Sequence, residues 1–156
     1  MFDRELSVFY ARKWANSFNP HYYNFTDLGG DCTNFVSQCL FYGGIEMNYD
    51  RYGWYYSSLN SRAPAWTGVE EFWSFGIGNE GKGIRLMACA YQDLSLSDVI
   101  QLGDNNGFYH SLIVSKIEYN SLGKNVFVCA HDYAALDIAL TDYSYRKIRY
   151  GKIMNT

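Results

Sequence analysis

The hydrophobic pattern of this chain changes its period about halfway along, and this change limits the folds open to it. Up to about residue 78, apolar side chains recur at helical spacing. From residue 98 onward, short segments rich in β-branched and aromatic residues alternate with turn residues. Helices that come first, followed by strands with no helix between them, are typical of the α+β class. We therefore expect N-terminal helices packed on a C-terminal antiparallel sheet.

Three helices and four strands follow from these patterns. The helices are predicted over residues 3–17, 32–42 and 67–78, and the strands over residues 98–102, 109–119, 125–131 and 145–153. Thr67, with Glu70 three residues later, has the spacing of an N-terminal capping box. The glycines at 43–44 predict that the second helix ends in a left-handed turn. Residues 120–123 are typical of a hairpin turn.

Length and composition bound the class of protein. The 156 residues suit one domain over residues 1–156, and 48% hydrophobic against 19% charged residues indicates a folded globular protein. A net charge of -3 provides no basic surface, so neither nucleic acid nor membrane is expected as a partner. The chain shows no apolar signal segment, so a cytoplasmic protein is expected. A domain taken from an exported parent would have the same sequence, and that alternative stays open.

One of the four cysteines has unusual surroundings. Three of them lie in apolar runs and are expected to be small buried hydrophobic residues: Cys39, Cys89 and Cys129. Cys32 instead follows Gly29, Gly30 and Asp31 at the predicted start of a helix. There the free N–H groups and the helix dipole favour a thiolate, and the N–H of Cys32 itself could hold an oxyanion. With no dense cysteine spacing, all four are expected to be free thiols, and Cys32 is the candidate nucleophile.

A nucleophilic cysteine needs a base, and the chain has three histidines. His21 lies in a predicted loop, whereas His110 opens the longest predicted strand. Counting back from the hairpin turn places His131 across from this part of the strand, close enough for one ring to orient the other. The predicted triad is therefore Cys32, His110 and His131, with Asp132 as the alternative third member.

A metal or phosphate site is a weaker interpretation. Cys129 and His131 have the spacing of a chelating pair, but no second ligand pair has structural-zinc spacing. Residues 76–83 contain glycines and a lysine, but no apolar strand precedes them as it does in a phosphate loop. No metal and no cofactor are expected.

Six segments, taken in order, resemble the bacterial putative amidase domain family of the papain-like cysteine peptidase superfamily. The specific block is GGDCTNFVSQ, with NPHYYNF before it and GWYY, DVIQ, HSLIV and AHD after it. The resemblance spans nearly the whole chain and implies a papain-like fold. It implies that Cys32 is the nucleophile, that His110 is the base and that His131 occupies the third polar position. It also implies that Asp31 holds a free amine of the substrate.

Residues and resemblance together predict an enzyme that forms an acyl thioester at Cys32. Water would discharge this thioester in an amidase or peptidase, and an amine would discharge it in an amide-forming transacylase. The expected substrate is a small-molecule or peptide acyl compound, which a carrier protein could deliver as a thioester. A peptidoglycan amidase of an exported protein and a non-catalytic binding module are the alternatives. Tyr23, Trp54 and Tyr55 are expected to line the substrate cleft, although aromatic clusters more often form core.

Overall fold

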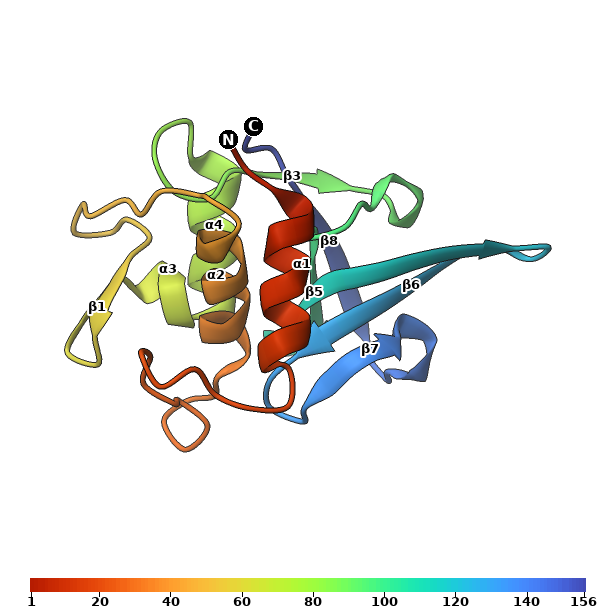
Figure 1. Cartoon of the computed structure of the whole chain (residues 1–156), viewed down its shortest axis with the longest axis horizontal. Helices are drawn as coiled ribbons and strands as arrows, with labels where there is room; N and C mark the ends of the chain where they lie inside the picture. The colour runs from red at the N-terminus through yellow and green to blue at the C-terminus, as the bar shows by residue number, and fades with distance from the viewer.

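Helices on one face of a six-stranded antiparallel sheet make up the molecule (Figure 1). The computed structural model describes all residues, 1–156. The helices are α1 (Arg4–Trp14), α2 (Cys32–Tyr42), α3 (Pro64–Thr67) and α4 (Val69–Gly78), and the short 3-10 turns are η1 (Tyr91–Asp93) and η2 (Leu140–Asp142). The sheet strands are β3 (Leu86–Cys89), β4 (Val99–Asp104), β5 (Gly107–Asn120), β6 (Gly123–Ala130), β7 (Ala135–Ala139) and β8 (Lys147–Ile153). A separate two-stranded ribbon consists of β1 (Tyr56–Ser58) and β2 (Ser61–Arg62).

The strand order in the sheet is β3-β8-β4-β5-β6-β7, with every neighbouring pair antiparallel. The predicted α+β class is therefore confirmed. The predicted hairpin is also present: β5 and β6 pair from Asn120 and Gly123 inward, and their tip extends well beyond the rest of the molecule (Figure 1). The sequence patterns missed β3 and β7, which are the two edges of the sheet. Both are short and half exposed, so they lack a long apolar alternation.

The helices differ from their predicted extents for local reasons. The segment predicted as one helix over residues 67–78 is two helices, α3 and α4, separated by Gly68 in an extended conformation. Thr67 is therefore the end of α3 and not a cap, and its hydroxyl accepts a hydrogen bond from Arg62 Nε. A capping box requires the backbone to enter the helix at the capping residue, and here it enters at Gly68. After α2, Gly44 has a φ of +109°, which confirms the left-handed turn.

Each face of the sheet has its own hydrophobic core, and β5 contributes to both. Ile113 belongs to a core of 18 buried residues between the sheet and the helices. Its neighbours Leu112 and Val114 belong to a second core of 10 buried residues on the opposite face. Because successive side chains of a strand point to opposite faces, each position of β5 has a defined side. We call the side of the sheet that packs against the helices the helix face, and the opposite side the open face.

The polar residues of α2 are buried but hydrogen-bonded. Gln38 Oε1 accepts a hydrogen bond of 2.6 Å from the Tyr10 hydroxyl, which attaches α2 to α1. Asn34 Oδ1 accepts one of 2.9 Å from the indole of Trp66, and Ser37 donates its hydroxyl to the Trp66 carbonyl at 2.9 Å. Buried polar groups of this kind stabilise a fold only when each has a partner. The helix that carries Cys32 is therefore attached to its neighbours by specific contacts.

None of the helices has both the length and the hydrophobicity that a membrane-spanning helix requires.

Candidate active site

Cys32 is the first residue of α2 and is 4% exposed. Its Sγ lies 4.0 Å from the carbonyl oxygen of Tyr109 on β5. The next residue, Thr33, makes a 2.9 Å hydrogen bond to the hydroxyl of Ser111. The start of α2 is therefore attached to the strand on both sides of His110, and the thiol lies against the backbone of that segment.

The resting state of Cys32 is the thiol and not the expected thiolate. The pKa of Cys32 is raised from its ordinary value of 9.0 to about 11, mainly by burial and in smaller part by the nearby charge of Asp132. A backbone hydrogen bond from Ser111 lowers the pKa but does not offset the burial. Another anion is bound at the start of the helix, to the N–H groups of Asp31 and Cys32.

That anion is the carboxylate of Asp132. The N–H of Asp31 donates to both of its oxygens at 2.8 Å, and the N–H of Cys32 donates to Oδ2 at 3.0 Å. The carboxylate fits because Gly30 has no side chain: a Cβ there would lie 2.7 Å from Asp132 Oδ2. The N–H of Cys32, which was expected to hold an oxyanion, is thus bound to Asp132 in this structure.

His131 does not orient His110. Its Nε2 donates to the carbonyl of Trp14 at 2.7 Å, and its Nδ1 lies 2.5 Å from Asp31 Oδ2, so both ring nitrogens are engaged elsewhere. The ring stacks on Phe35 of α2 at a centroid distance of 4.0 Å. The predicted triad with His131 as third member is therefore not the arrangement found.

A β-bulge explains this difference. Up to Lys116 and Phe127 the hairpin keeps the register set by its turn, but between Val114 and Lys116 the strand β5 has one extra residue. As a result Ile113 pairs with Cys129, and continuing this register places His131 beside Ser111 on the helix face. A one-residue shift moves a side chain to the other face of a sheet.

Asp31 is not available to bind a substrate amine. Its side chain is 1% exposed, and its Oδ1 accepts hydrogen bonds from the N–H of Phe25 at 2.8 Å and from Asn34 Nδ2 at 2.9 Å. Its Oδ2 is engaged by His131. Asp31 therefore joins the loop before α2, the helix itself and the end of β6, and the amine-binding role expected from the resemblance does not match this geometry.

His110 lies on the open face, because its neighbour Ser111 points to α2. The imidazole is 8% exposed, makes no hydrogen bond to another residue and has its centroid 6.4 Å from the ring of Tyr143. Burial lowers the pKa of His110, and the charge of Asp132 partly opposes this shift. The ring is therefore neutral at pH 7 and able to accept a proton. Asp132 acts on it through space and not through a hydrogen bond.

The three aromatic residues expected in a substrate cleft do not form one. Trp54 is fully buried, with its ring 4.6 Å from that of Trp66, and it belongs to the helix-face core. Tyr23 packs on Phe25, and Tyr55 packs on a different partner, Tyr49. The interpretation of Trp54 as core is the correct one.

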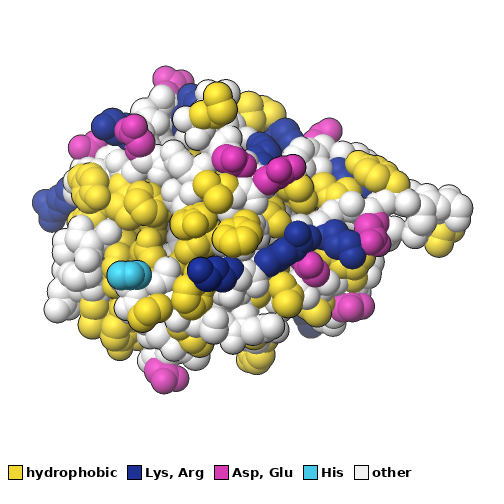
Figure 2. Space-filling model, in the orientation of Figure 1, with side chains coloured by type: hydrophobic (Ala, Val, Ile, Leu, Met, Phe, Trp, Pro, Cys, Tyr) yellow, Lys and Arg dark blue, Asp and Glu magenta, His cyan; other side chains and the backbone are white.

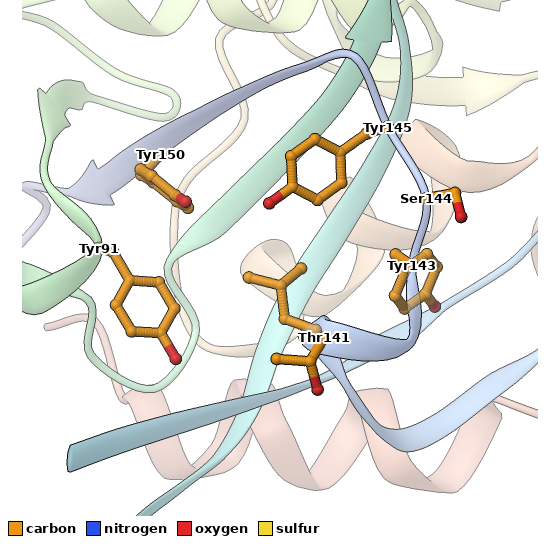
Figure 3. A pocket seen from close by; sticks show the side chains of 7 residues that line it. Tyr91, Thr141, Tyr143, Ser144, Tyr145 and Tyr150 are labelled. Carbon is orange, nitrogen blue, oxygen red and sulfur yellow. The ribbon is translucent and has the colours of Figure 1, made fainter. Parts of the chain in front are cut away.

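Two hollows in the surface contain residues that the sequence analysis did not select. A groove of about 780 Å³ lies between α1 and β5 and has Arg12, Lys13 and Lys116 along it. Figure 2 shows the side of the molecule on which α1 is exposed, where basic and hydrophobic side chains lie next to one another. A cavity of about 550 Å³ is lined by Tyr91, Leu140, Thr141, Tyr143, Ser144, Tyr145 and Tyr150 (Figure 3). Five of these cavity residues lie within residues 140–145, and only the fold brings Tyr91 and Tyr150 to them.

All four cysteines are free thiols. No group of three or more His, Cys, Asp or Glu side chains has an arrangement that could hold a metal ion.

Comparison with known proteins places the chain in a family. Residues 1–153 match the family described as "Putative amidase domain". The chain belongs to this family.

One relative is the "Uncharacterized protein YhbB" of Bacillus subtilis (strain 168), which is 33% identical over 125 residues. The match covers 76% of this chain but 39% of the relative, so the chain spans well under half of that protein's length. No solved structure matches the chain.

Proposed function

We propose that this protein is an amidase in which Cys32 is the nucleophile and His110 is the general base. The observation that carries the proposal is the position of the Cys32 thiol, at the start of α2 and 4.0 Å from the backbone of Tyr109, the residue before His110. Membership of an amidase family supports the reaction class. The pKa directions are compatible with the pairing, because burial keeps the thiol protonated and the imidazole neutral, as a base that takes the thiol proton requires.

The reaction begins with proton transfer from Cys32 Sγ to His110 as the sulfur attacks the carbonyl carbon of the amide. The C–N bond then breaks, the amine leaves with the proton from His110, and an acyl thioester remains on Cys32. Water attacks the thioester, which releases a carboxylic acid and restores the thiol. The imidazole must turn toward the sulfur when substrate binds, and such contacts often form only in the substrate complex.

In the resting enzyme, the carboxylate of Asp132 occupies the N–H group of Cys32 that would bind the oxyanion of the substrate. The attacked carbonyl oxygen becomes negative and needs N–H donors, and the N–H of Cys32 is the donor placed for it. The substrate oxygen therefore replaces the Asp132 carboxylate at this group. Asp132 and Tyr133 have φ values of 58° and 78°, which are unfavourable for residues other than glycine.

The same thioester could pass its acyl group to an amine, in which case the protein would form amides. A thioester carried by another protein would then be the natural donor. The family description favours hydrolysis, and we propose water as the acceptor.

The test is intact-mass spectrometry and product analysis with a panel of peptide amides, small amides and acyl thioesters. We expect an acyl adduct on Cys32, and we expect Cys32→Ala to lose at least about 1000-fold in turnover. Cys89→Ser is the matched control, because Cys89 is a free, partly exposed thiol on an edge strand. Full turnover by Cys32→Ala, or an adduct on another residue, would refute the proposal. An added amine that diverts the product from acid to amide would identify a transacylase.

A further inference from the structure

The cavity of Figure 3, which we call the tyrosine cavity, lies on the open face of the sheet. Its walls come from η1, from η2 and the segment that follows it, and from β8. Tyr91 and Tyr150 form one side, with ring centroids 6.0 Å apart and planes at 69°. Tyr145 points toward them from the other side in Figure 3. A ligand in this space would meet both faces and edges of aromatic rings.

The lining of the tyrosine cavity is uncharged and rich in hydroxyl groups. Every lining residue except Leu140 carries a hydroxyl. The Tyr91 hydroxyl donates to the carbonyl of Lys124 at 2.9 Å. The remaining hydroxyls have no partner within the protein, and they belong to Thr141, Tyr143, Ser144, Tyr145 and Tyr150. These groups are free to bond to a ligand.

This lining matches one class of ligand better than others. A sugar ring has an apolar C–H face, which packs on an aromatic ring, and a rim of hydroxyls, which bond to the groups around it. A purely aromatic ligand would leave the hydroxyls of the cavity without partners from the ligand. A quaternary ammonium group would find aromatic faces, but no carboxylate lines the cavity to balance its charge.

The position of the tyrosine cavity connects it to the candidate active site. Tyr143 lines it, and the ring of Tyr143 lies 6.4 Å from that of His110. Both His110 and the cavity are on the open face. The larger groove at Arg12 and Lys116 is instead formed by α1 and the far part of β5. A substrate that reaches Cys32 past His110 would therefore extend into the tyrosine cavity.

We propose that the tyrosine cavity binds a neutral sugar ring of the substrate, next to the amide that is cleaved. This inference rests on the proposed function for its place in the reaction, but the binding itself does not depend on catalysis. It makes the substrate a glycosylated amide or an amide-bearing saccharide.

The test measures binding directly with the full chain. The probes are neutral oligosaccharides built from glucose, galactose, mannose or N-acetylglucosamine, with benzyl alcohol and tetramethylammonium as comparison probes. Tyrosine ring signals in NMR spectra should shift saturably with at least one oligosaccharide. Tyr145→Ala should weaken this binding at least tenfold, because Tyr145 is 44% exposed and offers a ring face without holding the core. Tyr119→Ala, at the 75% exposed hairpin position, should leave it unchanged.

Three results would overturn the inference: no saturable binding of any oligosaccharide, binding of only benzyl alcohol or tetramethylammonium, or sugar binding that Tyr145→Ala does not weaken. The same titration on Cys32→Ala separates the two proposals. Sugar binding that persists in Cys32→Ala, together with lost turnover, supports both. Lost turnover without sugar binding refutes only the cavity, and sugar binding with full turnover in Cys32→Ala refutes only the nucleophile.

Discussion

The two faces of the sheet are built differently, although the same strand, β5, forms the centre of both. The helix face has the larger core, and its buried polar groups are connected, as in the contact of Asp31 with His131. The open face has the smaller core, an imidazole with no hydrogen-bond partner in His110, and tyrosine hydroxyls that face a cavity. The helix face thus holds the candidate nucleophile in place, whereas the open face keeps its polar groups available. The comparison teaches that the candidate nucleophile and the candidate base belong to opposite faces, and that the thiol contacts the backbone of the residue before His110.

The largest difference in stability between the two faces is expected when each of two buried histidines, His131 and His110, is replaced by alanine. His131→Ala should lower the free energy of unfolding by about 3–5 kcal/mol, because it leaves the carboxylate of Asp31 buried without its partner. His110→Ala should cost only about 1 kcal/mol, since no hydrogen bond is lost, yet it should abolish turnover. Urea unfolding followed by circular dichroism measures both. Equal losses of stability would show that the two faces do not differ in this way.

A second pair of variants tests the Asp132 contact on the helix face. Gly29 and Gly30 both have positive φ, so alanine is strained at either position. Only at Gly30 would the new Cβ also clash with the Asp132 carboxylate, because nothing lies within 4 Å at Gly29. Gly30→Ala should therefore cost about 2–3 kcal/mol and Gly29→Ala about 1 kcal/mol. If the order is reversed in unfolding experiments, the carboxylate does not occupy this position in solution.

The charge of Asp132 should also be visible in the reactivity of Cys32. Because burial and the charge of Asp132 together raise the pKa of Cys32 to about 11, alkylation by iodoacetamide should accelerate as the pH rises toward 11. Asp132→Asn should move this rise to lower pH and increase the rate at pH 8 by up to about tenfold, the effect of one pKa unit.

Asp142→Asn is the control for this experiment, because it removes the same charge from an exposed position in η2. The rate at Cys32 is measured by peptide mapping after timed alkylation. An equal change in both variants would mean that overall charge, and not the contact at the helix start, controls the thiol. No change in either would argue against the Asp132 contact.

The smallest effects are expected from single hydroxyl groups, again compared between faces. Tyr145→Phe on the open face removes a hydroxyl without a protein partner and should change stability by less than about 0.5 kcal/mol. Tyr10→Phe on the helix face removes a hydroxyl that bonds to Gln38 at 2.6 Å and to Asn19 at 3.0 Å, and should cost about 1–2 kcal/mol. Thermal unfolding with paired variants measures the difference. A stability loss in Tyr145→Phe as large as that in Tyr10→Phe would remove the contrast.

Much of the fold was predictable because it depends on short stretches of chain. The helical spacing of residues 3–17 predicted α1, and the glycines before Cys32 predicted where α2 begins. The turn residues between β5 and β6 predicted their hairpin. The split between α3 and α4 was missed, because it depends on one extended residue, Gly68, that the hydrophobic pattern does not mark.

The arrangement of the candidate site was less predictable, because it depends on contacts between distant segments. Spacing alone placed His131 across from the strand near His110, but one extra residue between Val114 and Lys116 shifts the pairing, so that His131 lies on the face opposite to that of His110. Asp31 and Asp132 are polar residues near a cysteine, and only their partners show that one is buried with His131 and the other covers the helix N-terminus. The tyrosine cavity combines side chains separated by up to about 60 positions, so no local pattern contains it.

The sequence by itself therefore determined the α+β class, the start of the Cys32 helix and the family to which the chain belongs. These properties depend on local periodicity, on turn residues and on one specific motif. Only the tertiary structure decided which face each histidine occupies, which anion binds the N–H of Cys32 and where the tyrosine cavity lies. Those outcomes depend on register, burial and long-range hydrogen bonds, which a single residue shift can change while the local pattern stays the same.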